Sequence, residues 1–404
     1  MFVSKDMLER YKKHISDAAI SDLRYRGKRL SDHSFLMVNT AKDGGGVAQI
    51  LSSLIPLFHD IDIDIDWKVL DEDEGFFDIT KRFHNGLQGE SIELSAADKQ
   101  RYRQGNTACW EDLDKDYDGY IIHDPQPAAL IDHINKPAVL RLHIDSSHPD
   151  DTAWSFLKQY FDEYDKIIVS QDQYYHEDLS VPHRVIPPAT DPFTAINKDL
   201  DGSNAKRRLE ERVGPHDHLI SQISRFDKWK DPEGVIEVFE RVREDVEASL
   251  LLLGSDAEDD PEGQAVYEAV KQRQANSPFA DDITVIMEND AALVNATQRY
   301  SDVVLQKSIR EGFGLTVSEA MLKQTPVVAS RVGGITEQIT HGENGFLHEP
   351  RKYDAFATTI KRLLDDETMK DQIGRRAKES VQQRFLMTRL LSDYLDLFEQ
   401  LFVD

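Results

Sequence analysis

The chain has 404 residues, of which 74 are acidic and 48 basic, and its formal net charge is −26. Its length favours two or three domains, and its hydrophobic fraction of 40% with 9% aromatics indicates a globular rather than a disordered protein. An acidic surface repels nucleic acid and anionic lipid, and no stretch approaches the roughly 20 apolar residues of a membrane helix, so neither partner is expected. The first ten residues, MFVSKDMLER, contain no apolar signal core, which predicts a cytoplasmic protein.

Cysteine content and charge set two further limits. Cys109 is the only cysteine, so we expect neither an intrachain disulfide nor a cysteine metal cluster. The acidic excess fits a salt-adapted organism and an ordinary acidic cytosolic surface equally well. In both cases a phosphate site has to be a local basic exception on this surface.

Short apolar runs alternate with helical stretches along the whole chain. Because these runs are continuously apolar rather than alternating, they are typical of parallel strands buried on both faces. The alternation with helices predicts an α/β protein with doubly wound parallel sheets. The expected strands are 35–39, 61–70, 119–123, 138–144, 166–170 and 184–187 in the first half, and 218–224, 248–254, 283–287, 302–306, 326–330 and 345–348 in the second.

The segment 187–214 separates the two sets of strands. It begins with PPATDP and continues through NKDLDGSNAKRRLEER, which indicates a linker with a short helix. We therefore expect a boundary near residues 190–215, with domains at 1–200 and 213–380. The residues after 354 have a helical apolar period, which predicts a helical C-terminus.

Three glycines, Gly44, Gly45 and Gly46, follow the strand 35–39 and precede an apolar helix at 47–58. Glycines at such a turn let backbone N–H groups approach a phosphate at a helix N-terminus. A tight turn without a ligand explains the same pattern equally well. The full GxGxxG fingerprint is not present, so a dehydrogenase is disfavoured.

A basic cluster, Arg225 to Lys230 (RFDKWK), comes directly after the strand 218–224. Open parallel sheets bind ligands at the carboxyl ends of their strands. Arg225 and Lys230 are therefore candidates to clamp a diphosphate, the arginine with its planar fork and the lysine as a point charge. The alternative is a solvated loop with unrelated charges, and we favour the diphosphate site.

A nine-residue string, EGFGLTVSE, follows the strand 302–306. Glu311 is expected in the loop and Glu319 one turn into a helix at 316–322. Two ionised carboxylates placed in this way can accept hydrogen bonds from sugar hydroxyls. A single loop glutamate and a single helical glutamate are usually just solvated, but the complete string is more specific.

The order of these motifs resembles the retaining glycosyltransferases of family four, which have the GT-B fold. Arg225 and Lys230 come first, then Glu311 and Glu319, then SRVGG at 330–334. Other strings are more similar to the trehalose glycosyltransferring synthases and the related trehalose phosphorylases. These strings are GGGVA at 44–48, WKV at 67–69, the run 76–89, HDPQ at 123–126, RLHIDS at 141–146 and QKSIREGFG at 306–314.

The resemblance implies two Rossmann-like domains, an active site in the cleft between them, and a C-terminal helix at 381–404 that crosses back to the first domain. It implies that Arg225 and Lys230 neutralise the donor diphosphate and that Glu319 binds the nucleoside ribose. It also implies that Glu311 faces the donor sugar. The remaining donor residues that it implies are Gly45, Gly46, Gly312, Phe313, Gly314 and Leu315.

On the acceptor side the resemblance implies a set of residues in the first domain. His143, which we expect at the end of the strand 138–144, would reach the donor sugar or the reaction centre; otherwise it is a core histidine. The acceptor candidates are Trp67, Lys68, Asn85, His123, Asp124, Gln126 and Asp145. Strand-end caps and loop contacts are the alternative explanation for them.

The reaction that the resemblance implies is transfer of glucose from UDP-, ADP-, GDP- or TDP-glucose to glucose, with retention, to form α,α-trehalose. The alternatives are phosphorolysis of trehalose, a family-four transfer to another acceptor, and a nucleotide-sugar-binding regulatory protein without turnover. No cofactor or metal is expected to be required, although Mg²⁺ can assist the product nucleotide. The expected partners are small-molecule sugars and nucleotide sugars, and a homodimer is compatible with the sequence.

Overall fold

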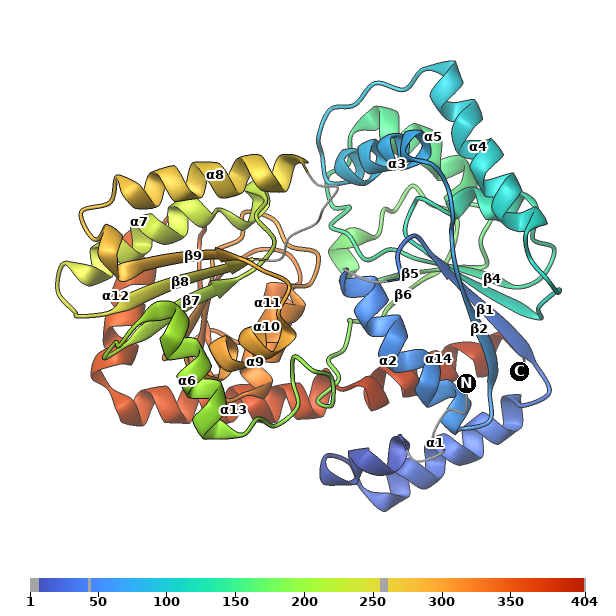
Figure 1. Ribbon diagram of the computed structural model, residues 1–404. Helices are drawn as coiled ribbons and strands as arrows, with labels where there is room; N and C mark the ends of the chain where they lie inside the picture. The colour runs from blue at the N-terminus through green and yellow to red at the C-terminus, as the bar shows by residue number, and fades with distance from the viewer. Residues whose placement is uncertain (1–6, 43–44, 255–260, 403–404) are drawn as a thin grey trace. The chain divides into compact units, whose positions relative to one another are not determined.

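The computed structural model describes residues 7–42, 45–254 and 261–402. Within them the chain forms two compact units (Figure 1). Unit 1 contains the chain up to Ala189 and again from Met387, and unit 2 contains Thr190–Leu386. The linker helix α6 (Gly202–Val213) therefore belongs to unit 2. Residues 190–200 also belong to unit 2, whereas the predicted first domain, 1–200, included them.

Unit 1 is built on a parallel sheet that has six strands in the described residues, in the order β2-β1-β3-β4-β5-β6. The order reverses between β1 and β3, which makes this the topological switch point of the sheet. The strands are β1 (Ser34–Asn39), β2 (Asp64–Val69), β3 (Gly119–His123), β4 (Ala138–Arg141), β5 (Lys166–Val169) and β6 (His183–Val185). The helices are α1 (Asp17–Leu30), α2 (Gly46–Asp60), α3 (Glu74–Leu87), α4 (Ala96–Glu111), α5 (Asp151–Phe161) and α14 (Met387–Phe402).

The last helix, α14, is part of unit 1 because its apolar face packs against β1 and α2. The ring of Phe398 stacks on Phe35 with centroids 4.2 Å apart and lies 5.7 Å from the ring of Phe58. On its outer side α14 binds α1, where the Arg26 guanidinium donates to Glu399 Oε2 at 3.0 Å. Burial of these aromatic side chains ties the C-terminal helix to a sheet formed 200 and more residues earlier.

Unit 2 contains a second parallel sheet, whose six strands in the described part of the chain have the order β12-β11-β10-β7-β8-β9. This is the strand order of Rossmann folds, and its switch point lies between β7 and β10. The strands are β7 (Leu219–Ile223), β8 (Ser249–Gly254), β9 (Ile283–Met287), β10 (Val303–Gln306), β11 (Val327–Ser330) and β12 (Phe346–His348). The helices besides α6 are α7 (Pro232–Arg243), α8 (Pro261–Ala275), α9 (Ala291–Tyr300), α10 (Leu315–Leu322), α11 (Ile335–Gln338), α12 (Tyr353–Asp365) and α13 (Glu367–Arg384).

Strand β8 shows why continuous apolar runs predict these sheets. Leu250 and Leu252 belong to the core cluster that includes α7 and α12, whereas Leu251 and Leu253 belong to the cluster that includes α9 and α10. Successive side chains therefore point into two different apolar layers, and both sets have to be apolar. The predicted α/β class with doubly wound parallel sheets is confirmed.

The observed strands differ from the predicted ones mainly at their ends. The largest differences are at 61–70, where β2 begins only at Asp64, and at 138–144, where β4 ends at Arg141. The backbone before β2 turns through Asp62, which has a left-handed φ of 64°. Five short 3₁₀ helices complete the connections in the described residues: η1 (Leu8–Lys13), η2 (Ala128–Asp132), η3 (Asp172–Tyr174), η4 (Lys228–Lys230) and η5 (Ala280–Asp282).

Candidate active site

In unit 2 the two motifs with the strongest sequence signal follow neighbouring strands at the switch point. The basic cluster from Arg225 to Lys230 comes after β7, and the string from Glu311 to Glu319 comes after β10. Because β7 and β10 are adjacent and parallel, both motifs lie at the same edge of the sheet. This is the position at which doubly wound sheets bind nucleotides.

The two motifs meet through an ion pair. Lys230 Nζ lies 2.7 Å from Glu311 Oε2, and both side chains are mostly buried. The same carboxylate oxygen accepts a hydrogen bond from Ser308 Oγ at 3.1 Å, and Gln306 Nε2 lies 3.5 Å from it. The pair thus places a cation and an acceptor group side by side, which suits a ligand that carries both phosphate and hydroxyl groups.

Asp227 orders the basic cluster, although sequence analysis did not select it. Its Oδ1 accepts hydrogen bonds from the backbone N–H groups of Trp229 (2.7 Å) and Lys230 (3.2 Å), and its Oδ2 lies 3.4 Å from Arg225 Nη2. The Arg225 side chain is 62% exposed, whereas that of Lys230 is 16% exposed. Lys230 is therefore held in place, and Arg225 remains accessible to an anion.

Gln222 joins the two loops at the base of the site and was also missed. Its Nε2 donates to the carbonyl of Lys230 at 3.1 Å, and its Oε1 accepts from the backbone N–H of Lys307 at 3.1 Å. The buried Lys307 ammonium in turn pairs with Asp231, the residue after Lys230. A glutamine inside an apolar strand was the available signal, since a buried amide needs partners on both sides.

The glycine loop before α10 has a close contact that only glycine permits. Gly314, at the N-cap, has a left-handed φ of 82°. A Cβ on Gly334 would lie 2.4 Å from both the Gly312 carbonyl oxygen and Phe313 Cα. The side chain of Phe313 points into the core against Phe385, with ring centroids 5.6 Å apart, so only its backbone is available to a ligand. Leu315, the first residue of α10, likewise packs against the apolar core of unit 2.

Glu319 lies in the middle of α10, as predicted, and is almost fully buried. Its Oε2 accepts a hydrogen bond from Gln298 Nε2 of α9 at 3.0 Å. Lys323, at the end of α10, donates to Gln298 Oε1 at 2.8 Å. Gln298 and Lys323 were not selected from the sequence, because nothing local relates them to Glu319.

In unit 1 the two candidate glycines also follow a strand at the switch point of the sheet. Gly45 and Gly46 open α2 after β1, and Gly44 lies outside the described residues. Gly45 has an extended backbone (φ −141°), and a Cβ there would meet nothing within 4 Å. The fold therefore does not require a glycine at position 45.

Two histidines form a pair at the carboxyl ends of β3 and β4: His123 is the last residue of β3, and His143 comes after β4. His123 Nδ1 lies 2.9 Å from His143 Nε2, and the rings stack with an interplanar angle of 15°. Burial lowers the pKa of His123 to about 3, and it lowers the pKa of His143 well below the ordinary value. Both rings are thus neutral near pH 7 and act as hydrogen-bonding groups.

His143 does not end the strand, as was predicted, but lies in the loop two residues after β4. Asp124, with a left-handed φ of 67°, accepts a hydrogen bond from the backbone N–H of His143 through Oδ1 at 2.7 Å. This bond to a side chain replaces the backbone hydrogen bond that would continue the pairing of β4 with β3, so β4 ends before His143. Burial raises the pKa of Asp124 to about 7.

Two buried polar atoms of the acceptor candidates have no hydrogen-bond partner within the described residues. They are His123 Nε2 and Gln126 Oε1. The Gln126 backbone carbonyl is satisfied by Asn106 Nδ2 at 3.2 Å. Unsatisfied buried polar groups are uncommon in native proteins, and a bound sugar hydroxyl is one group that would satisfy them.

The other acceptor candidates have contacts elsewhere in unit 1. Trp67 Nε1 donates to Asn39 Oδ1 at 2.7 Å, and the Lys68 ammonium pairs with Asp112. Asn85, in α3, accepts through its backbone carbonyl from Glu90 N at 3.0 Å. Asp145 Oδ1 accepts from Ser147 Oγ at 2.6 Å. The hydrogen bonds of the described residues therefore join His123, Asp124 and His143 to one another but do not join these four to them.

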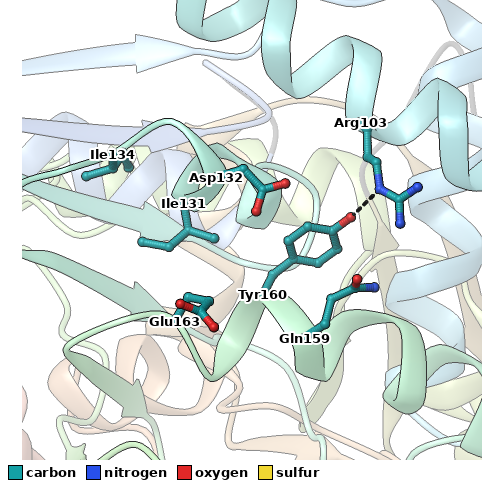
Figure 2. A pocket seen from close by; sticks show the side chains of 7 residues that line it. All are labelled: Arg103, Ile131, Asp132, Ile134, Gln159, Tyr160 and Glu163. Atoms are coloured by element: carbon teal, nitrogen blue, oxygen red, sulfur yellow. Dashed lines mark hydrogen bonds between the residues drawn. The ribbon is translucent and has the colours of Figure 1, made fainter.

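A cavity of about 410 Å³ in unit 1 lies apart from these residues (Figure 2). Figure 2 shows Arg103, whose Nε donates to Tyr160 Oη at 2.9 Å. Asp132 precedes β4 and Glu163 precedes β5, so this cavity belongs to the amino ends of the strands. The candidate site residues follow the carboxyl ends, where parallel sheets bind their ligands.

No group of three or more histidine, cysteine or acidic side chains within the described ranges is placed to hold a metal ion. None of the helices in those ranges is long and apolar enough to cross a membrane.

Comparison with known proteins agrees with this geometry. Residues 37–176 match the family model of the trehalose synthase N-terminal domain, and residues 206–380 match that of glycosyl transferases group 1. The chain is 42% identical over 397 residues to a trehalose synthase of Thermococcus litoralis, with 96% of each chain covered. It is 29% identical to a trehalose phosphorylase of Pleurotus pulmonarius over 82% of this chain and 52% of that one.

A solved structure with the same fold is the α,α-trehalose-phosphate synthase (UDP-forming) of Burkholderia xenovorans. Its TM-score is 0.72 at 14% identity, with 91% of this chain and 100% of that chain covered. The predicted family and the GT-B fold are confirmed. The chain therefore belongs to the trehalose synthase family of family-four glycosyltransferases with the GT-B fold, and it is a trehalose-related glycosyltransferase.

Proposed function

We propose that this enzyme transfers glucose from a nucleoside diphosphate glucose to free glucose, with retention of configuration, to form α,α-trehalose. The observation that carries the proposal is the ion pair of Lys230 and Glu311 at the switch point of unit 2, 2.7 Å between Nζ and Oε2. It combines a cation for the diphosphate with a carboxylate for the donor sugar at the edge where such sheets bind nucleotides. The 42% identity to a protein named trehalose synthase supports the choice of product.

In this proposal unit 2 binds the donor. Arg225, which is exposed, and Lys230, which is held by Asp227, neutralise the diphosphate. Glu311 accepts a hydrogen bond from a hydroxyl of the transferred glucose, and Glu319 accepts from the ribose. Lys230 then stabilises the negative charge that develops on the leaving diphosphate, the kind of preorganised electrostatic contribution that dominates much of catalysis.

Unit 1 binds the acceptor glucose in this proposal. His123 Nε2 and Gln126 Oε1 offer unsatisfied polar atoms, and the neutral imidazole of His143 can accept or donate a hydrogen bond without adding charge. Gly45 leaves space for a phosphate to approach the amino end of α2, which begins at Gly46.

The proposed chemistry breaks the bond between the glucose anomeric carbon and the donor phosphate oxygen. The new bond forms from the acceptor hydroxyl on the same face, and the proton of that hydroxyl passes to the departing phosphate oxygen. No protein nucleophile is required, so the protein contributes mainly by positioning and by charge stabilisation. We also propose that the transfer needs no metal ion, which a product assay in the presence of EDTA tests directly.

The decisive experiment is a product assay on the purified protein. Glucose is offered with UDP-, ADP-, GDP- or TDP-glucose, each separately, and trehalose is offered with inorganic phosphate in parallel. Trehalose formed from a nucleotide donor supports the proposal and identifies the preferred base. If no donor gives trehalose, the proposed reaction is wrong.

Phosphorolysis is the second candidate, because the chain is also similar to proteins named trehalose phosphorylase. Both reactions need an anion pocket, but only the transfer needs a ribose contact. Glucose 1-phosphate formed only from trehalose and phosphate, with no product from nucleotide donors, would establish the phosphorylase instead.

A further inference from the structure

A buried polar chain lies behind Glu319. Lys323 Nζ donates to Gln298 Oε1 at 2.8 Å, and Gln298 Nε2 donates to Glu319 Oε2 at 3.0 Å. The exposed fractions are 8% for Lys323, 0% for Gln298 and 4% for Glu319. The chain connects the end of α10 with its own middle through a side chain of α9.

The Gln298 amide can take only one orientation in this chain. Its oxygen faces an ammonium and its nitrogen faces a carboxylate. A flip of the amide would set oxygen against carboxylate and N–H against ammonium, which removes both hydrogen bonds at once. Lys323 therefore determines that an N–H group points at Glu319.

The Lys323 ammonium is satisfied in full by its surroundings. Besides Gln298 it donates to the Glu319 backbone carbonyl at 3.2 Å and to Asn197 Oδ1 at 2.5 Å. Burial lowers the pKa of Lys323 to about 7; the nearby Glu319 carboxylate opposes this shift and Arg299 adds to it. Burying an ammonium is costly compared with an apolar side chain of similar size, so a structural role alone does not account for a lysine here.

We propose that Lys323 is a positioning residue for the nucleotide, because through the Gln298 amide it orients the Glu319 carboxylate toward the ribose hydroxyls. This inference rests on the ribose contact in the proposed function. It assigns a role to a residue that lies four positions beyond Glu319 and needs no contact with the substrate.

The test measures how strongly the protein recognises ribose hydroxyls. Dissociation constants are determined by calorimetry for the tightest-binding of UDP, ADP, GDP and TDP, for its 2′,3′-dideoxy analogue, and for inorganic pyrophosphate. In the wild type, removal of the ribose hydroxyls weakens binding. In Lys323→Met, binding of the nucleoside diphosphate weakens by about tenfold, as expected for a lost hydrogen bond to a charged group, and the preference for ribose hydroxyls shrinks. Pyrophosphate binding stays unchanged.

A second variant tests the relay itself. Gln298→Met removes the middle of the chain and has the same effect as Lys323→Met. The double variant is no worse than either single one, because all three break the same path. Additive losses would overturn the relay.

Thr325→Val is the matched control. Thr325 Oγ1 donates to the backbone carbonyl of Gln298 at 2.5 Å, so this variant removes a buried hydrogen bond from the same residue without affecting its amide. Thermal unfolding of each variant sets a temperature at which all are folded. Thr325→Val keeps the wild-type preference for ribose hydroxyls; an equal loss in this control would indicate a general structural effect and overturn the proposal.

The outcomes separate the inference from the function on which it rests. If the wild type and Glu319→Gln bind both nucleotides alike, the ribose contact in the proposed function is wrong. If Glu319→Gln abolishes the preference while Lys323→Met retains it, the ribose contact holds and the role of Lys323 is overturned.

Discussion

Lys230 and Glu311 are 81 residues apart in the chain, yet Nζ of one lies 2.7 Å from Oε2 of the other. The contact exists because β7 and β10 are neighbours at the point where the strand order of unit 2 reverses. A donor that binds here would meet both charges together, and a loss of either leaves the other mostly buried without its partner.

Replacement of Lys230 by alanine should lower turnover by about 10²–10³-fold, the loss typical for removal of one group that stabilises developing negative charge. The fold should remain, since Asp227 bonds the backbone of residue 230 rather than its side chain. Steady-state kinetics with far-UV circular dichroism measure both. Lys228→Ala is the matched control, since it removes another lysine of the same turn. The Lys228 ammonium lies over the Trp229 ring, 5.2 Å from its centroid. Turnover of Lys230→Ala close to that of the control would contradict a role at the diphosphate.

Changing Glu311 and Glu319 to glutamine, one at a time, should affect different steps of the reaction. Glu311→Gln should reduce the rate of transfer more than the affinity for nucleoside diphosphate, because its carboxylate is assigned to the donor sugar. Glu319→Gln should reduce nucleotide affinity more than the rate, because it is assigned to the ribose. Single-turnover rates and calorimetric dissociation constants provide the comparison. Equal losses of both quantities in both variants would indicate that the residues act only structurally.

Two glycine variants should distinguish a role in folding from a role in binding. In Gly334→Ala the new Cβ would lie 2.4 Å from backbone atoms of Gly312 and Phe313, so the loop must shift, at a cost of about 1–3 kcal/mol in the free energy of unfolding. In Gly45→Ala the new Cβ meets nothing within 4 Å, so stability should stay the same.

Activity of Gly45→Ala should nevertheless fall if phosphate approaches the amino end of α2 closely. Urea unfolding and the product assay are measured on the same preparations. A fully active Gly45→Ala enzyme would remove Gly45 from the donor site.

The buried histidine pair should make stability depend on pH in the acid range. Folded His123 and His143 stay neutral below their ordinary pKa of 6.5, whereas the unfolded chain binds protons there, so each raises the free energy of unfolding as pH rises toward 6.5. Asp124 acts in the opposite sense, because its pKa is raised from 3.8 to about 7 and the folded state holds a proton that the unfolded state has released. Two histidines against one aspartate leave a net rise of about 1.4 kcal/mol per pH unit between about pH 4.5 and 6.

His143→Asn should remove one of the two histidine contributions and keep the backbone bond to Asp124. The difference in free energy of unfolding between wild type and variant should then change by about 1.4 kcal/mol per pH unit in that range and level off above pH 6.5. Urea unfolding at half-unit pH steps measures it. A difference that does not vary with pH would show that His143 is protonated alike in the folded and unfolded states.

How much of the site was predictable depends on how local the signal was. The RFDKWK cluster and the EGFGLTVSE string each lie directly after an apolar strand, so their place at the carboxyl end of a sheet followed from the sequence. Asp227 could have been found, since an aspartate before a short polar turn commonly accepts from the next backbone N–H groups. His143 was placed correctly near β4 but wrongly within the strand, because its N–H bonds a carboxylate from the neighbouring loop.

The sequence by itself determined the class of the fold, the approximate strands and the motifs, because buried parallel strands and strand-end loops have local patterns of apolar and polar residues. Only the tertiary structure decided that β7 lies beside β10, that Phe313 points into the core, and that Lys323 reaches Glu319 through Gln298. Strand order and side-chain partners are decided by packing between segments far apart in the chain. The pattern of apolar and polar residues within one segment does not predict which distant side chain will contact it.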